Sequence, residues 1–335
     1  MRLRILTEDD CRALLGMAEA IDVQAEAFAL LAAGRSIEGL RSLAISEHPP
    51  GAAIFNPAFL KDGGGYGIKV VSDFYDNEQK GVPRMSALVA LFDGQTGRPR
   101  TIMEAGYLTD LRTGAGTGLG ARHLARRDSR TVTIFGAGRV ARNQLQAICE
   151  VCQVTKVLVA TRTEARGRDF VARMKKAGGR VPRQIELVTS RPEAVQAADI
   201  VVCATTAHDP VFPGQALRPG TFVVAAGAYQ ATAREVDSDT IRRAAKRVID
   251  SRADSLAHAG DLIIPMGEGI LAEADITQIS EIVSGQRPGR ESDHEIIYFK
   301  SSGVPIQDLV TAQHIERRAI ERDLGTMIDI GGDHD

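Results

Sequence analysis

The pattern of apolar and polar residues changes twice along the chain, and each change predicts a domain boundary. After a segment at 18–33 with apolar residues at helical spacing, short apolar runs between glycine-rich turns predict a small β-sheet up to about residue 105. From 130 to about 290, strand-like runs alternate with helical stretches, which is typical of βαβ units and a parallel sheet. The tail returns to the first pattern, with a strand at 295–300 and a helix at 306–322.

These changes predict an α/β fold with two domains. We expect a doubly wound parallel sheet (Rossmann) domain over 113–294, and a smaller α+β sheet domain built from both chain termini, 1–112 and 295–335. A helix at 108–126 is expected between them, and Thr7 with Asp10 predicts a helical N-terminus. The expected strands lie at 67–71, 87–92, 101–103, 131–135, 156–160, 185–188, 199–203, 221–225 and 247–250.

Composition restricts the class of protein. With 335 residues, 44% hydrophobic and 25% charged, the chain resembles an ordinary globular protein rather than a disordered one. The net charge of −2 supplies no basic field for nucleic acid or an anionic membrane. No apolar run reaches the ~18 residues of a membrane helix, and residues 1–10 turn acidic where a secretory signal would be apolar. We therefore expect a cytoplasmic protein with a small-molecule partner, without nucleic-acid or membrane partners.

Cysteine and histidine usage argues against a metal site. The four cysteines are too few for a disulfide framework in a chain of this length. Cys149 and Cys152 form a C-x-x-C without a second pair, so a zinc ion would lack ligands. The seven histidines are scattered and form no ligand pattern. We expect these cysteines to be small packing residues and no metal to be bound.

A glycine motif predicts a dinucleotide site. Gly136, Gly138 and Ala141 follow the strand expected at 131–135 and open a helix, which is the context that this motif requires. The first glycine permits the tight turn, the second lets the backbone approach a pyrophosphate, and the alanine lets helix pack close to strand. The N–H groups at the start of the helix then hold the phosphate.

The end of the next strand indicates which dinucleotide binds. An NAD site usually carries Asp or Glu about 20 residues after the glycines, bonded to the ribose 2′-OH. Here Arg162 stands between Thr161 and Thr163, and the nearest acid, Glu164, comes only afterwards. Arginine pairs bidentately with phosphate and threonine adds a donor, so the sequence favours NADP(H), with NAD(H) possible. The alternative is a solvated surface arginine.

Three cations precede the nucleotide domain. Lys69 lies inside an apolar strand, where it either faces solvent or is directed at an anion. Arg112 lies early on the helix at 108–126, which places it near the expected nucleotide crevice. Together with Arg41, these groups would bind a carboxylate if the fold brings them together.

The chain resembles the ornithine cyclodeaminase/mu-crystallin family along nearly its whole length. The matching segments share their order and spacing with the family: 67–71, 91–93, 107–113, 136–138, 226–227, Glu235 with Asp237, and 299–303 with Asp308. The resemblance implies a Rossmann domain joined to a sheet domain that mediates dimerisation, and hence a homodimer. The family contains ornithine cyclodeaminases, alanine dehydrogenases and ketimine reductases, which all move hydride at the α-carbon of an amino acid.

The resemblance also implies roles for individual residues. Arg41, Lys69 and Arg112 match the ligands of the substrate carboxylate. Thr161, Arg162 and Thr163 match the Asn-Arg-Thr trio that reads NADPH in mu-crystallin. The complete set implied to hold the cofactor is Thr113, Gly136, Ala137, Gly138, Arg139, Val140, Thr161, Arg162, Thr163, Ala204, Thr205 and Ala226.

One departure from the family pattern bears on the activity. Cyclodeaminases carry an Asp six residues before the position of Glu235, where this chain has Tyr229. A phenol, whose pKa is about 10, is a poor base at neutral pH. Mu-crystallin also lacks the Asp and reduces ketimines, whereas archaeal-type alanine dehydrogenases generally keep it. We therefore favour an NADPH-dependent reductase of ketimines such as pyrroline- or piperideine-2-carboxylate. Two alternatives stay open: a cyclodeaminase or amino-acid dehydrogenase, and a non-catalytic NADPH-binding protein.

Three further residues have two interpretations each. Asp308 either stabilises the charge of an iminium substrate or caps the helix at 306–322. Tyr229 either donates a proton or packs. Arg84 either binds a second substrate carboxylate or occupies a surface turn. Residues 43–56, which are expected to shape the side-chain pocket, carry no readable signature.

Overall fold

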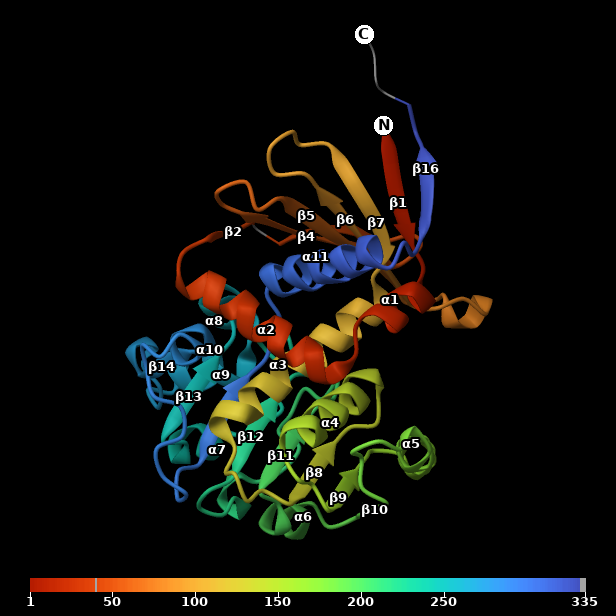
Figure 1. The fold of residues 1–335 in the computed structure, drawn as a ribbon. Helices are drawn as coiled ribbons and strands as arrows, with labels where there is room; N and C mark the ends of the chain where they lie inside the picture. Colours follow the sequence, from red (N-terminus) through yellow and green to blue (C-terminus); the bar gives the residue numbers. More distant parts are fainter. Residues whose placement is uncertain (40, 332–335) are drawn as a thin grey trace. The chain divides into compact units, whose positions relative to one another are not determined.

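The structure, a computed structural model, describes residues 1–39 and 41–331. Contacts between Cα atoms divide the chain into two units, Met1–Arg112 with Val304–Asp335, and Thr113–Gly303. The fold is α/β: a doubly wound parallel sheet in one unit, and an α+β arrangement in the shorter unit that contains both chain ends (Figure 1). Within the described residues, none of the helices combines the length and apolarity that a bilayer-spanning segment requires.

The unit that contains both termini is built on one sheet in the order β16-β1-β7-β6-β5-β4-β2, with β3 paired to β4. Apart from the parallel pair β1–β7, its neighbours are antiparallel. The strands are β1 (Arg2–Leu6), β2 (Ser36–Glu38), β3 (Ser42–Ser46), β4 (Gly51–Leu60), β5 (Tyr66–Phe74), β6 (Met85–Phe92), β7 (Pro99–Glu104) and β16 (Thr326–Asp329).

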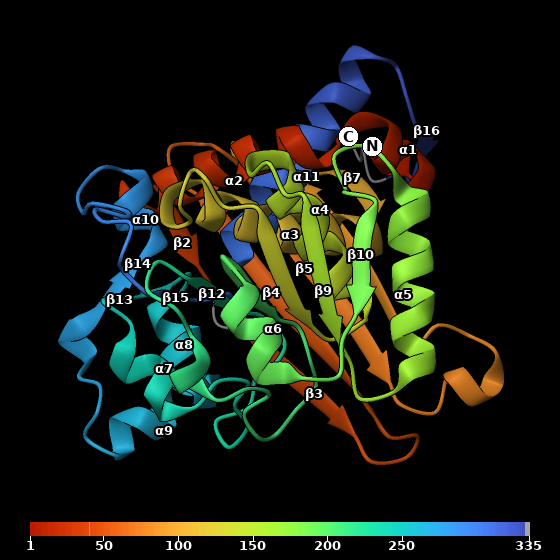
Figure 2. The same cartoon turned by 90° about the horizontal axis from the view of Figure 1, so that it is seen from below.

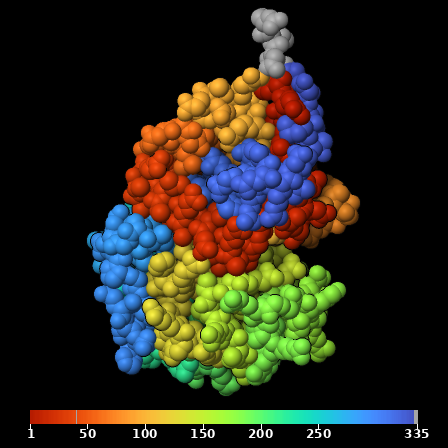
Figure 3. All heavy atoms as spheres, viewed as in Figure 1, coloured from red at the N-terminus to blue at the C-terminus, as the bar shows by residue number. Residues whose placement is uncertain are grey.

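Helices α1 (Glu8–Leu14) and α11 (Pro305–Glu321) pack on this sheet, and a third helix, α2 (Met17–Ala32), packs against α11. Helix α11 packs on β4, β5 and β6 and against α2, so segments from opposite ends of the chain lie side by side (Figures 1 and 3). In β5, alternate residues are buried beneath α11, and Lys69 belongs to this buried set.

The N-terminus differs from the sequence prediction. The chain begins with β1, whose Leu3 and Leu6 are buried, and the helix begins only at Glu8. The predicted helix start itself is present, because Thr7 Oγ1 accepts the N–H of Asp10 and Asp10 Oδ2 accepts the N–H of Thr7. Residues 43–56, which carried no readable pattern, form β3 and much of β4.

The second unit contains a sheet in the order β10-β9-β8-β11-β12-β15-β13-β14, and its pairs are parallel. The strand order reverses between β8 and β11, which is where a doubly wound sheet opens a crevice for a ligand. The strands are β8 (Thr131–Phe135), β9 (Lys156–Ala160), β10 (Gln184–Leu187), β11 (Ile200–Cys203), β12 (Phe222–Ala225), β13 (Lys246–Ile249), β14 (Ile276–Gln278) and β15 (Ile297–Lys300).

The helices of this unit follow the strands in alternation, and α5 lies alongside β10 (Figure 2). They are α4 (Arg139–Val151), α5 (Glu164–Ala177), α6 (Arg191–Ala197), α7 (Ser238–Arg243), α8 (Arg252–His258), α9 (Gly260–Gly267) and α10 (Ile279–Val283). The chain enters through α3 (Gly106–Leu124), the helix expected at 108–126, which contains several glycines. One of them has a packing reason, because a Cβ on Gly120 would lie 2.8 Å from the ring of Phe299.

The second domain boundary requires a correction. The sequence analysis assigned 295–300 to the terminal domain, but this segment forms β15, which pairs with β12 and β13 inside the parallel sheet. The boundary therefore moves from 294/295 to 303/304. The buried residues Tyr298 and Phe299 lie on this inner strand of the parallel sheet.

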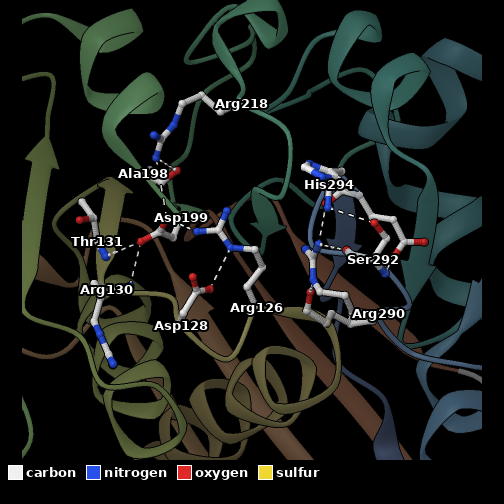
Figure 4. Close-up of polar contacts among 12 residues, drawn as sticks. Arg126, Asp128, Arg130, Thr131, Ala198, Asp199, Arg218, Arg290, Ser292 and His294 are labelled. Atoms are coloured by element: carbon white, nitrogen blue, oxygen red, sulfur yellow. Dashed lines mark hydrogen bonds and ion pairs between the residues drawn. The ribbon is translucent and has the colours of Figure 1, made fainter.

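An ion-paired aspartate, Asp199, connects neighbouring strands at the amino end of the parallel sheet (Figure 4). Asp199 Oδ1 accepts from Arg126 Nη2 at 2.7 Å, and Oδ2 accepts the backbone N–H groups of Arg130 and Thr131 at 2.8 and 2.9 Å. These contacts join the starts of β8 and β11. They hold the sheet at the end opposite to the carboxyl ends of the strands, where a ligand is expected.

Candidate functional site

The carboxyl ends of β8, β9 and β11 open onto a cavity of about 730 Å³ in the second unit. The volume is in the range of small-molecule and cofactor sites. The lining residues are Phe135, Gly136, Ala137, Gly138, Ala160, Thr161, Arg162, Thr163, Arg166, Asp169, Arg191, Ala204, Thr205, Thr206, Ala207, His208, Asp209, Pro210 and Val211. Most residues of the predicted cofactor set belong to this lining, whereas Thr113, Arg139, Val140 and Ala226 do not.

The glycine turn has the geometry that the motif requires. Gly136 adopts a φ of 107°, and a Cβ there would lie 2.3 Å from the carbonyl oxygen of Ala204. A Cβ on Gly138 would meet no atom within 4 Å, so this residue leaves open space beside the cavity. Helix α4 begins at the next residue, and Ala141, in the first turn of this helix, is fully buried. The start of a helix offers backbone N–H groups to a phosphate, and α4 starts here, beside the cavity.

Arginine side chains dominate the charge of this cavity. Arg162 lines it at the end of β9, between Thr161 and Thr163, and Arg166 and Arg191 line it as well. Sequence reasoning missed these last two. Arg166 lies in the first turn of α5, directly after the Thr161–Thr163 segment, so its proximity could have been expected from the sequence. Arg191 lies at the start of α6 and reaches the cavity only through the fold.

A buried acidic network supports the loops that follow β11 and β12. Glu235 is fully buried and accepts hydrogen bonds from both loops, and Asp261 and Lys300 lie behind it. Burial raises the pKa of Glu235 above its ordinary value, while Lys300 acts in the opposite direction. The sequence analysis noted Glu235 only as a family match, because the contacts come from distant segments.

The terminal unit contains a second buried polar group. Lys69 Nζ lies 2.7 Å from Asp308 Oδ2, and Arg112 Nε lies 2.9 Å from Oδ1 of the same carboxylate. Arg112 Nη1 also donates to Gln307 Oε1 at 3.4 Å. Arg41 Nε donates to Asn56 Oδ1 at 3.0 Å, and Asn56 faces Lys69 across β4 and β5. The structure therefore brings the three predicted cations into one neighbourhood, together with Asp308.

The pKa values follow from this arrangement. The pKa of Lys69 is lowered to about 8, first by burial and then by the positive charge of Arg112, while Asp308 acts in the opposite direction. Burial alone would raise the pKa of Asp308, but Arg112 and Lys69 outweigh it and hold this pKa below the ordinary range. The helix-capping interpretation of Asp308 is not what the structure contains, since Gln307 Oε1 accepts the N–H of Val304 at the start of α11.

Two further predicted residues, Arg84 and Tyr229, have surroundings of their own. Arg84 forms a bidentate pair with Asp73, with Nε–Oδ1 at 2.6 Å and Nη2–Oδ2 at 3.0 Å, and stacks over the ring of Tyr75. Its charge is thus directed at a carboxylate of the protein. Tyr229 lies in the second unit after β12, with 66% of its surface exposed.

Among the residues that the structure describes, no group of three or more His, Cys, Asp or Glu side chains could hold a metal ion. Cys149 is buried and Cys152 is partly buried, and burial raises their pKa values to about 12 and about 11. A thiol with so high a pKa carries little of the thiolate that reacts or binds metal.

Comparison with known proteins places the chain among amino-acid oxidoreductases. Residues 2–323 match the model of the ornithine cyclodeaminase/mu-crystallin family. A Δ1-pyrroline-2-carboxylate reductase of Bacillus cereus is 32% identical over 326 residues, which is 97% of this chain and 99% of that protein.

Two solved structures share the whole architecture. The Δ1-pyrroline-2-carboxylate reductase of Thermococcus litoralis, in complex with NADH and L-proline, is 38% identical with a TM-score of 0.90, over 96% of this chain and 99% of that one. An archaeal alanine dehydrogenase dimer with bound NAD is 30% identical with a TM-score of 0.90, over 99% of this chain and 100% of that one.

Proposed function

The chain belongs to the ornithine cyclodeaminase/mu-crystallin family, and we propose that it is an NADPH-dependent reductase of imines of 2-oxo acids. The substrate class is a ketimine such as pyrroline-2-carboxylate or piperideine-2-carboxylate, and the product is the α-amino acid. Similarity to the pyrroline-2-carboxylate reductases of Bacillus cereus and Thermococcus litoralis supports the reaction type.

The observation that carries this proposal is the buried group of Lys69, Arg112 and Asp308. Two cations share one carboxylate there, so the group has a net positive charge and suits a substrate carboxylate. Arg41, held by Asn56, supplies a third cation. In the proposed role Lys69, Arg112 and Arg41 bind the carboxylate of the imine, and Asp308 orients the two buried cations and offsets the charge of the iminium nitrogen.

Imine reduction requires little acid–base chemistry from the protein. A ketimine can bind already protonated on nitrogen, so its carbon is electrophilic before any residue acts. The nicotinamide cofactor supplies the hydride when bound. The protein's part is to fix the carboxylate and the plane of the imine, and such fixed orientation provides much of the rate in bound reactants. A base at the position of Tyr229 is then unnecessary.

The cavity of the second unit fits a dinucleotide. Its open space at Gly138, the start of α4 and the loops carrying Ala204 and Thr205 suit a pyrophosphate and a nicotinamide ribose. Arg162, Arg166 and Arg191 outnumber the two aspartates in the lining, which favours a 2′-phosphate and hence NADP(H) over NAD(H).

A homodimer is part of the proposal. The sheet face of the terminal unit opposite to Lys69 carries exposed Ile37, Phe59 and Leu88 beside stacked aromatic rings. An apolar surface of this kind marks an interaction site. The archaeal alanine dehydrogenase that the chain resembles is a dimer.

The test is reductant consumption with a panel of imines: pyrroline-2-carboxylate, piperideine-2-carboxylate, and pyruvate with ammonia or methylamine. We expect fast NADPH-dependent turnover of a cyclic ketimine and slower turnover with NADH. Release of ammonia from ornithine would instead identify a cyclodeaminase, and turnover of pyruvate with ammonia alone an alanine dehydrogenase. Tight NADPH binding without turnover of any imine would identify a binding protein.

A further inference from the structure

Glu235 lies between two loops that come from neighbouring strands of the parallel sheet. Its Oε1 accepts the backbone N–H and the hydroxyl of Thr205 at 2.6 and 2.7 Å. Its Oε2 accepts the N–H groups of Gly227 and Ala228 at 2.7 and 3.1 Å. One carboxylate thus holds the loop after β11 with one oxygen and the loop after β12 with the other. We call Glu235 and these three partners the Glu235 clamp.

Two further buried residues, Asp261 and Lys300, hold the Glu235 clamp in place. Asp261 Oδ1 accepts the N–H groups of Glu235 and Val236 at 2.7 and 3.1 Å, which fixes the backbone of the clamp residue. Lys300 Nζ lies 2.6 Å from Asp261 Oδ2 and donates to the carbonyl oxygen of Ala228 at 2.6 Å. Glu235, Asp261 and Lys300 are all fully buried, so the anchor is shielded from water.

The clamped loops touch the glycine turn of the cofactor site. A Cβ on Gly227 would lie 2.1 Å from the carbonyl oxygen of Thr205, so only glycine permits this approach of the two loops. A Cβ on Gly136 would lie 2.3 Å from the carbonyl oxygen of Ala204. The backbone therefore runs in direct contact from the phosphate turn through Ala204 and Thr205 to Gly227, with Glu235 fixing the far end.

We propose that Glu235 is a positioning residue that sets the β11 and β12 loops in the conformation that receives the nicotinamide half of the cofactor. This inference rests on the proposed function, since it assumes that a dinucleotide occupies the cavity lined by Ala204 and Thr205. Glu235 touches neither substrate nor cofactor in this role. It acts through the four donors that it holds.

The test variant is Glu235→Gln. The glutamine amide has one acceptor oxygen, so its NH₂ group must face the N–H donors of one of the two loops. We expect the Kd for NADPH, followed by its fluorescence, to rise about tenfold or more. We also expect the amide protons of Thr205, Gly227 and Ala228 to exchange faster, while those of strands β11 and β12 keep their protection.

A matched control comes from the same segment. Asp237 accepts from Gly214 and Thr240 and caps α7, without contact to either loop. Asp237→Asn should leave the Kd for NADPH and the exchange at Thr205 and Gly227 unchanged. Thr205→Val removes the hydroxyl that donates to Glu235 and accepts the N–H of Ala207, and it leaves the backbone N–H of Thr205 on Glu235. It should give a smaller effect in the same direction, and it keeps the inference testable if the glutamine variant does not fold.

The outcomes separate the two proposals. If the unsubstituted protein binds neither NADPH nor NADH, the proposed function fails, whereas the exchange measurement still examines the loops. If it binds NADPH but Glu235→Gln and Thr205→Val bind equally well, with unchanged exchange at the three amides, the positioning role of Glu235 is overturned.

Discussion

Lys69 Nζ lies 2.7 Å from Asp308 Oδ2, and this pair joins β5 to the first turn of α11 beneath the protein surface. Arg112 occupies the other oxygen of the same carboxylate. The two partners respond to burial in opposite ways: the pKa of Lys69 falls to about 8, while Asp308 is kept ionised by its two cations. The charge available to a substrate carboxylate therefore depends on pH in a range where most lysines do not titrate.

The first prediction concerns that pH dependence. As pH rises through about 8, Lys69 loses its proton and one of the cations that bind the carboxylate is lost, so the KM for the imine should rise. In Asp308→Asn the anion that opposes deprotonation is removed, so the rise should begin at lower pH. Steady-state kinetics of both proteins from pH 6 to 10 would measure the shift.

The control for this experiment is Asp73→Asn. Asp73 is buried on the same face of β5 and pairs with Arg84, away from Lys69. Its loss should leave the midpoint of the KM profile in place. An equal shift in both variants would mean that the pair of Lys69 and Asp308 does not control substrate binding.

The second prediction concerns Arg112. Arg112→Gln removes a charge-assisted hydrogen bond to Asp308 but leaves Lys69 as a partner, so the free energy of unfolding should fall by about 1–3 kcal/mol. Because the same group is proposed to bind the substrate carboxylate, kcat/KM should fall about a hundredfold, mainly through KM. Arg112→Lys restores the charge without the planar fork and should recover only part of both losses. Urea unfolding and kinetics on the three proteins would separate the effects, and a loss of stability without a change in KM would contradict the binding role.

The alternation of strands and helices from 130 onward was readable from the sequence because buried parallel strands are short continuous apolar runs. The strand at 131–135, for example, is β8, and its glycine turn has the positive φ that the motif requires. The opposite is true of β3 and β4. Their residues mix small, polar and proline positions, and they become strands through pairing, β4 with β5 and β3 with β4.

The candidate site could also be predicted only in part from the sequence. The sequence identified Lys69 and Arg112 as candidate ligands of a carboxylate. It did not show whether Lys69 faces solvent or an anion, because the partner Asp308 lies on a helix more than 190 residues further along the chain. Arg84 shows the reverse case, because Asp73 on the adjacent strand neutralises a residue that the sequence offered to the substrate. Single side chains read in isolation do not reveal such long-range partners.

The third prediction concerns cofactor choice. Arg162→Ala removes a proposed partner of the 2′-phosphate, so the KM for NADPH should rise about tenfold or more while that for NADH changes little. Arg168→Ala is the matched control, because Arg168 lies nearby on α5, pairs with Glu164 and is not part of the cavity lining. A parallel loss of NADPH and NADH use in Arg162→Ala would show that this arginine does not read the phosphate.

The fourth prediction concerns the oligomer. Leu88→Glu places a charge on the apolar sheet face that carries Phe59 and Ile37, and a buried charge at an interface is costly. We expect the variant to elute as a monomer in size-exclusion chromatography with light scattering. Ile320→Glu changes a more exposed apolar residue on α11 and should leave the dimer intact. A dimer that survives Leu88→Glu would place the interface on another surface.

The last prediction concerns Tyr229, the residue that replaces the cyclodeaminase aspartate. A protonated ketimine needs no base for reduction, and the Tyr229 side chain is 66% exposed, so the hydroxyl should contribute little to the chemistry. Tyr229→Phe should keep kcat within about threefold of the unsubstituted protein, with the same pH profile. Tyr229→Ala, which also removes the ring, should raise the KM for the ketimine if the ring packs against substrate. A fall in kcat of about tenfold or more in the phenylalanine variant, with a normal KM, would instead identify the phenol as a proton donor.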